Sequence, residues 1–132
     1  MTNVGKPDLA VGLIRTRDAS ERPIEEGAGI VPYVAELTAT VENQGDAFAD
    51  ETATRFWVRG AGVDRELRVV HTPGLLPGDQ IEVTALWDVR FSDGEYAIIV
   101  TADVFGQIDE VRKDNNVATA HLTVGCGKVR QS

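Results

Sequence analysis

The sequence predicts an all-β protein, folded as an antiparallel two-layer β-sandwich of about seven strands. Three observations lead to this class. Short segments alternate apolar and polar residues, which is the period of a strand with one buried face. Glycine, proline, asparagine and aspartate cluster between these segments, and helix signals are nearly absent. Because no crossover helix is available, the strands must pair mainly antiparallel, and such a set closes into a sandwich, with an eight-stranded barrel as the alternative.

The first two strands are predicted on either side of a charged connection. Residues 8–14 form a short strand with one apolar face: Leu9, Val11 and Leu13. Residues 15–29 carry alternating charges, a proline and two glycines, which is typical of an exposed connection. The next strand has the clearest alternation, with its inward face formed by Tyr33, Ala35, Leu37, Ala39 and Val41. The turn residues 43–46 end it.

Three further strands follow in the middle of the chain. Thr54, Phe56 and Val58 mark the inward face of one strand, which ends at the glycines of 60–62. The next covers 63–70, with Leu67 and Val69 in phase, and 72–79 form a turn. A later strand has the inward face Ile81, Val83, Ala85 and Trp87.

The segment 96–124 predicts a final pair of strands around a polar loop. Alternate apolar residues enter the loop and leave it: Tyr96, Ile98, Val100 and Ala102, then Ala118, Ala120, Leu122 and Val124. The loop itself is rich in carboxylates and amides: Asp103, Asp109, Glu110, Asp114, Asn115 and Asn116.

The 132 residues predict one domain over 7–124, with flexible tails at 1–6 and 125–132. A net charge of −8 disfavours nucleic acid as a partner, because phosphate contacts require cations. No apolar run reaches the roughly 20 residues that span a bilayer, so no membrane insertion is expected. The start has no signal-peptide pattern. Cys126 is the only cysteine, which excludes an internal disulfide and leaves an incidental thiol, a crosslink or a lipid attachment as alternatives.

Several short motifs occur in an order that resembles the CARDB family of bacterial and archaeal surface proteins. They are Lys6-Pro7-Asp8-Leu9, Val41-Glu42-Asn43-Gln44-Gly45, Leu76-Pro77-Gly78, Thr101-Ala102-Asp103, Asp109-Glu110, and Asn115-Asn116 preceded by Asp114. Together they span almost the whole chain. The resemblance implies an immunoglobulin-like sandwich of seven strands, used as a repeated or accessory domain in large surface or secreted proteins, and it does not imply an enzyme.

The acidic loop has two interpretations. Its carboxylates, Asp103, Asp109, Glu110 and Asp114, supply oxygen ligands of the kind that Ca²⁺ takes, although the EF-hand spacing is absent. Alternatively, Asp103, Asn115 and Asn116 cap the hairpin, since short polar side chains bond free backbone groups. No other cofactor is expected.

A second candidate site lies on the strand of Phe56. Trp57 has the opposite phase from Phe56 and Val58, together with Arg55 and Arg59, and should therefore point away from the core. An aromatic ring between guanidinium groups can serve as a platform for a sugar or a partner's aromatic side chain. The alternative is that the arginines stack on the ring and another segment or domain covers it.

Catalysis has no support in the sequence. Serine lies only in turns or tails, no Gly-x-Ser-x-Gly motif is present, and neither histidine has the neighbours that zinc requires. We therefore expect a non-catalytic module that acts as a spacer or as a protein-interaction and adhesion unit, with protein or neighbouring domains as partners. The resemblance places it outside the cell or at its surface. The alternative function is a carbohydrate-binding accessory domain centred on Trp57.

Overall fold

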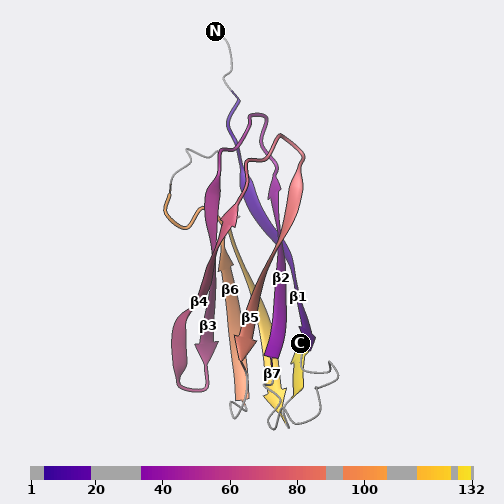
Figure 1. Ribbon diagram of the computed structural model, residues 1–132, viewed down its shortest axis with the longest axis vertical. Helices are drawn as coiled ribbons and strands as arrows, with labels where there is room; N and C mark the ends of the chain where they lie inside the picture. The colour runs from indigo at the N-terminus through magenta and orange to yellow at the C-terminus, as the bar shows by residue number, and fades with distance from the viewer. Residues whose placement is uncertain (1–4, 19–33, 89–93, 107–115, 126–127, 132) are drawn as a thin grey trace, which may run out of the picture.

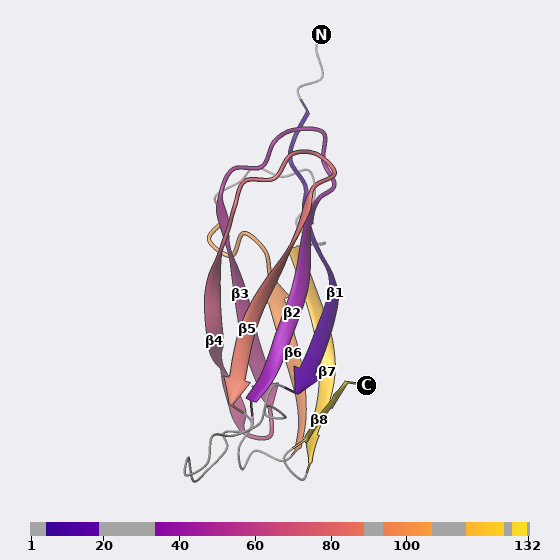
Figure 2. The same ribbon diagram turned by 45° about the vertical axis from the view of Figure 1, so that its right-hand side comes forward.

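The structure is a computed structural model that describes residues 5–18, 34–88, 94–106, 116–125 and 128–131. Within these ranges the chain forms eight strands: β1 (Leu9–Asp18), β2 (Val34–Asn43), β3 (Thr52–Gly60), β4 (Val63–Thr72), β5 (Gln80–Asp88), β6 (Gly94–Thr101), β7 (Val117–Gly125) and β8 (Lys128–Gln131). Figures 1 and 2 show two layers of strands that run close to the long axis of the molecule. The predicted all-β class is confirmed.

The two layers are antiparallel sheets of unequal size. One has the order β1-β2-β5 and the other has the order β4-β3-β6-β7-β8. All pairings between the strands are antiparallel. The predicted two-layer sandwich is therefore correct, and the barrel alternative is not adopted.

The core lies between the sheets and consists mainly of side chains that the alternation placed inward. Those that are buried in β2, β3, β5, β6 and β7 include Ala35, Leu37, Ala39, Val41, Thr54, Phe56, Val58, Val83, Ala85, Trp87, Tyr96, Ile98, Val100, Ala120, Leu122 and Val124. Trp87 of the smaller sheet meets Tyr96 of the larger one edge to face, with ring centroids 4.8 Å apart. This contact joins the two layers, since such aromatic pairs add to the free energy of burial.

The prediction for β1 is wrong after Gly12. The strand continues to Asp18, so the first residues of the expected exposed connection are strand, and the pairing with β2 shifts register between Gly12 and Arg15. An extra residue in one strand reverses the facing of every later side chain. The inward position therefore falls on Ile14, which is 6% exposed.

A second bulge corrects the prediction for β4. Phe56 pairs with Arg68, but Trp57 pairs with Glu66, so Leu67 is an extra residue opposite β3. Leu67 and Val70 pack against the core, in place of the predicted pair Leu67 and Val69. The physical reason is again that a bulge changes which residues face inward.

Part of the expected C-terminal tail is a strand. β8 pairs with β7, with Val129 opposite Val124. The side chain of Gln131 then reaches β1, where Nε2 donates to the Ile14 carbonyl at 2.7 Å and Oε1 accepts from the Thr16 N–H at 3.2 Å. The last strand thus links the two sheets at one side of the sandwich.

The loops after β2 and β4 meet at the end of the molecule where residues 5–8 enter (Figure 1). Asn43 is fully buried there. Both the oxygen and the nitrogen of its side-chain amide form hydrogen bonds. Oδ1 accepts the N–H groups of Asp8 and Gly45, and Nδ2 donates to the carbonyls of Ala47 and Leu75. Ala49 and Leu75 also exchange two backbone hydrogen bonds, so these loops are held rigidly together.

Candidate functional site

The candidate site begins with the outward face of β3. Arg55, Trp57 and Arg59 alternate with buried Thr54, Phe56 and Val58, as predicted. Trp57 is half-buried on this face, where Arg55 lies over its ring. The structure therefore brings the three predicted binding residues onto one face.

Asp64 of β4 completes this group. Its Oδ1 accepts the indole N–H of Trp57 at 2.5 Å and the Nε–H of Arg59 at 3.1 Å. The two hydrogen bonds and the positive charge of Arg59 lower the pKa of Asp64 below its ordinary value of 3.8, with the bond from Trp57 as the largest cause. The carboxylate fixes the indole in one orientation.

The sequence analysis did not assign Asp64 to this site, but a signal was present. Ala61 and Gly62 both have positive φ, 47° and 80°, which is the pattern of a two-residue type I′ hairpin turn. That turn sets the register in which Gly60 pairs with Val63 and Arg59 with Asp64. If Ala61-Gly62 is taken from the sequence as a two-residue hairpin turn, Asp64 is predicted to lie directly opposite Arg59.

Arg55 stacks on the indole ring of Trp57. It precedes Trp57 by two residues on β3, whereas Arg59 follows it by two. The Cζ atom of Arg55 lies 4.9 Å from the centroid of the Trp57 ring, which is cation–π geometry. The Nε atom of Arg55 is buried and has no hydrogen-bond partner among the described residues. A buried donor without a partner is uncommon, and a bound molecule or water is one way to satisfy it.

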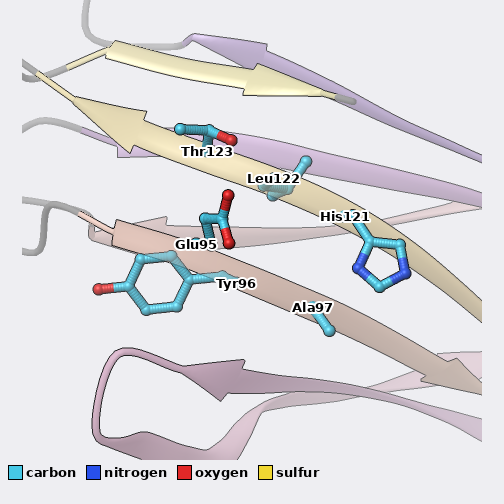
Figure 3. Close-up of a pocket in the computed structure, with 6 residues that line it drawn as sticks. All are labelled: Glu95, Tyr96, Ala97, His121, Leu122 and Thr123. Carbon is cyan, nitrogen blue, oxygen red and sulfur yellow. The ribbon is translucent and has the colours of Figure 1, made fainter.

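A shallow hollow of ≈ 380 Å³ lies farther across the same sheet. Figure 3 shows its lining, which comes from neighbouring stretches of β6 and β7: Glu95, Tyr96, Ala97, His121, Leu122 and Thr123. Ala97 pairs with Arg59 on one side and with His121 on the other. The hollow therefore lies in the same row across the sheet as Arg59. Ala97 has only a methyl group, which leaves room beside the larger side chains of Glu95 and His121.

The acidic loop is described only at its ends. Asp103 is 5% exposed and has φ of 46°, a left-handed conformation that aspartate tolerates better than most residues. The Ala102 N–H donates to the carbonyl of Asn116, which closes the loop where β6 ends and β7 begins. Asp109, Glu110, Asp114 and Asn115 lie outside the described residues, so the calcium site and the capping role of Asn115 remain predictions. Within the described ranges no three His, Cys, Asp or Glu side chains group together as metal ligands do.

The fold is that of an immunoglobulin-like sandwich domain, and the sequence gives its family. The CARDB family model matches residues 6–120. The chain belongs to the CARDB family. In the described ranges no helix is both long and apolar enough to span a bilayer.

Solved structures similar to this one include two archaeal domains. The CARDB domain of the PF1109 protein from Pyrococcus furiosus, in complex with di-metal ions, has a TM-score of 0.63 and 25% identity, over 93% of this chain and 97% of that one. A domain of a Methanosarcina acetivorans protein provisionally assigned to the cell surface has a TM-score of 0.63 and 21% identity, over 92% of this chain and 94% of that one.

An enzyme also contains a domain of this shape. Beta-glucosidase 3B from Thermotoga neapolitana has a TM-score of 0.61 and 15% identity over 95% of this chain, but this chain covers only 16% of the enzyme. That likeness concerns the fold alone. No curated protein matches the sequence.

Proposed function

We propose that this chain is a non-catalytic immunoglobulin-like module, which acts as a spacer or protein-interaction unit of a cell-surface or secreted protein. The observation that carries the proposal is the rigid end of the sandwich, where buried Asn43 joins the entering chain to two loops. Membership in the CARDB family and the likeness to a domain provisionally assigned to the cell surface support the same role. An extracellular location follows as part of this proposal.

The loops at this end present apolar side chains to a partner. Phe48 and Leu76 are 51% and 59% exposed, although their neighbours Ala49 and Leu75 are buried and bonded to each other. Exposed apolar side chains on a rigid support suit a protein contact, because little conformational entropy is lost when they bind. A neighbouring domain of the same polypeptide is the partner that we propose.

The test compares backbone amide NMR shifts of the isolated chain with those of the same chain inside its native polypeptide. We expect differences at 44–49 and 74–79 that disappear in Phe48→Ser/Leu76→Ser. Glu66→Gln/Arg68→Gln, on an exposed edge strand away from these loops, is the matched control. Identical shifts in both contexts would exclude a neighbouring domain as the partner of these loops.

Calcium binding by the loop is a second proposal. The ligands would be Asp103, Asp109, Glu110 and Asp114, and the di-metal complex of the PF1109 domain favours the idea. Calcium titration of the ¹⁵N-labelled protein should give saturable shifts at 102–106 and a higher melting temperature, both reversed by chelator. Unchanged spectra at millimolar calcium would leave hairpin capping as the role of Asp103, Asn115 and Asn116.

The carbohydrate alternative at Trp57 rests on its outward ring. Arg55 covers one face of the ring, and Asp64 accepts a hydrogen bond from the indole N–H. A sugar would therefore have to stack on the part of the ring surface that Arg55 and Asp64 leave uncovered. Quenching of tryptophan fluorescence by polysaccharide fragments, lost in Trp57→Ala, would favour this function. Quenching that survives Trp57→Ala would exclude Trp57 as the platform.

A further inference from the structure

The outer face of the smaller sheet has a hollow of its own, of ≈ 300 Å³. Its lining comes from β1, β2, the turn after β2, and the start of β5: Ala10, Val11, Gly12, Thr40, Glu42, Gln44 and Gln80. The strand register explains its shape. Ala10, Glu42 and Gln80 lie in one row across the sheet, and Gly12 and Thr40 begin the next row.

Gly12 lines the hollow at the start of the β1 bulge, and neither a close neighbour nor a positive φ requires glycine there. An added Cβ at Gly12 would meet nothing within 4 Å, and its φ is outside the left-handed range. The glycines with which it contrasts have either a positive φ or a close neighbour: Gly5, Gly45, Gly60, Gly62, Gly74, Gly78, Gly94 and Gly106. Glycine weakens a strand interior, and it often marks either a bulge, such as the one that follows Gly12, or a place where a ligand approaches the backbone closely.

The rim of the hollow carries planar polar groups. Among the described residues, the side chains of Glu42, Gln44 and Gln80 have no hydrogen-bonding partner in the protein. Ala10, Val11, Gly12 and Thr40 complete the lining. Four of the seven lining residues carry polar side chains, so the hollow is more polar than a typical drug-sized pocket and suits a ligand rich in hydroxyl groups.

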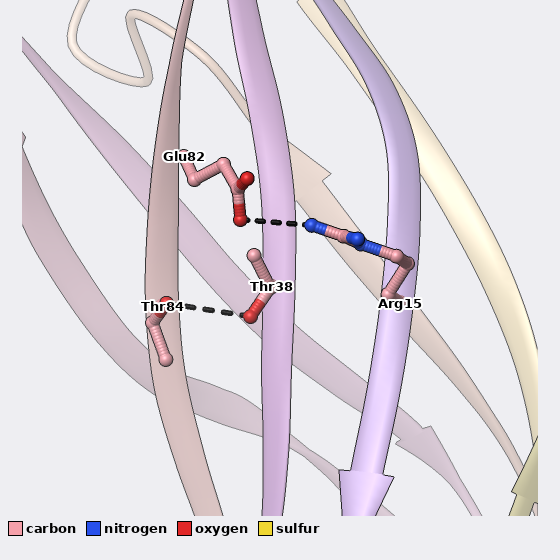
Figure 4. A network of polar contacts seen from close by, with 4 residues as sticks. All are labelled: Arg15, Thr38, Glu82 and Thr84. Atoms are coloured by element: carbon pink, nitrogen blue, oxygen red, sulfur yellow. Dashed lines mark hydrogen bonds and ion pairs between the residues drawn. The ribbon is translucent and has the colours of Figure 1, made fainter.

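An ion pair lies next to the hollow, on the side of Thr40, which pairs with Glu82. Figure 4 shows the Arg15 side chain reaching from β1 across β2 to Glu82 of β5, at 2.9 Å. Next to it, the hydroxyl oxygens of Thr38 and Thr84 lie 3.4 Å apart. A second hollow, lined in part by Glu36 and Thr38, lies beyond this pair. Arg15 and Glu82 line this second hollow and do not line the one at Gly12.

We propose that the hollow at Gly12 binds a single neutral sugar residue. Two amides, a carboxylate and a hydroxyl offer the donors and acceptors that pair with neighbouring sugar hydroxyls. The ring's apolar face would lie on Ala10 and Gly12. Its lining contains Glu42 and no cation, which disfavours acidic sugars. The volume is at the lower end for ligand sites, so one residue fills it.

The test is a ¹⁵N amide-shift titration with the methyl glycosides of glucose, galactose, mannose and N-acetylglucosamine. Each is raised to about 10 mM, tenfold above a Kd of 1 mM. For at least one of them we expect saturable shifts at Gly12, Thr40 and Gln44, with side-chain amide shifts at Gln80. Gly12→Val fills the hollow and should abolish them, while it raises the melting temperature by about 2–5 °C, because a β-branched residue replaces an unneeded glycine.

Two further variants complete the design. Glu42→Ala removes one hydrogen-bonding group and should weaken binding at least tenfold. Glu36→Gln is the matched control, since Glu36 is also an outward carboxylate of β2 but lines the hollow beyond the ion pair. It should leave the affinity unchanged.

The other outcomes overturn the proposal. Absence of saturable shifts with all four sugars would do so, as would shifts that persist in folded Gly12→Val. Shifts centred on Trp57 would move sugar binding to the other sheet. If Gly12→Val unfolds the protein, the glycine is structural, and full affinity in Glu42→Ala would then exclude the site.

Discussion

The side-chain oxygen of Asn43 accepts the backbone N–H of Asp8 at 3.1 Å, although the two residues are 35 positions apart. The same oxygen accepts the N–H of Gly45, and Nδ2 donates to Ala47 and Leu75. One buried amide thus satisfies backbone groups of the entering segment and of both crossover loops. No apolar residue can replace it without leaving buried backbone groups unpaired.

Replacement of Asn43 should therefore be strongly destabilising. We expect Asn43→Ala to lower the free energy of unfolding by at least about 3 kcal/mol, because four hydrogen bonds are lost in a buried position. Asn43→Asp should also destabilise the fold, and more at pH 7 than at pH 4, since a carboxylate would face two carbonyl oxygens. Urea unfolding at both pH values measures this. Exposed Gln44→Ala is the control and should change stability by less than about 0.5 kcal/mol.

Protonation of Asp64 should release the Trp57 indole. The pKa of Asp64 is lowered in the folded protein, so its contribution to stability is present above its ordinary value of 3.8 and is lost as pH falls through the folded value. The indole ¹⁵N–¹H resonance of Trp57 should titrate below pH 3.8, whereas that of buried Trp87 should not follow it. Asp64→Asn should remove the titration. A Trp57 resonance that does not move with pH would contradict the hydrogen bond.

Thr54 and Thr72 form a buried pair between β3 and β4. Their hydroxyl oxygens lie 2.7 Å apart, and both side chains are fully buried. Thr54→Val should cost about 1–2 kcal/mol, because it leaves the Thr72 hydroxyl unpaired. The double change to valine should cost less than the sum of the two single changes, with a coupling of about 1 kcal/mol. Additive effects in thermal unfolding would show that the pair contributes nothing.

The β3–β4 turn carries strain that can be removed. Ala61 has φ of 47°, a region that costs an alanine about 1 kcal/mol. Asn-Gly is the favoured pair for a type I′ turn, so Ala61→Asn should stabilise the protein by about 0.5–1 kcal/mol. Gly62→Ala should destabilise it by a similar amount, since Gly62 also has positive φ. A lower melting temperature for Ala61→Asn would contradict this interpretation of the turn.

The alternation of apolar residues predicted the sandwich and most of its core because a half-buried strand has a period of two. It failed at the bulges near Gly12 and Leu67, where one extra residue reverses the facing. Only the first bulge has a compositional signal, which is the glycine inside the strand. The outward position of Trp57 followed from the same period, but its carboxylate partner required the register of the Ala61-Gly62 turn. β8 was missed because only four residues form it, and its position depends on the pairing with β7 and on Gln131.

Gln131 should protect the edge of β1. Its amide bonds the Ile14 carbonyl and the Thr16 N–H, in the way that a neighbouring strand would, and so covers backbone groups that an edge strand otherwise exposes. Gln131→Ala should destabilise the local structure by about 1–1.5 kcal/mol and speed hydrogen exchange of the Thr16 amide roughly tenfold. Amides of β3, such as Phe56, report global opening and should change much less. Gln131→Glu keeps the acceptor for Thr16 but loses the donor to Ile14, so its effect should be intermediate. Equal exchange at Thr16 in all three proteins would mean that β8 does not hold β1 in solution.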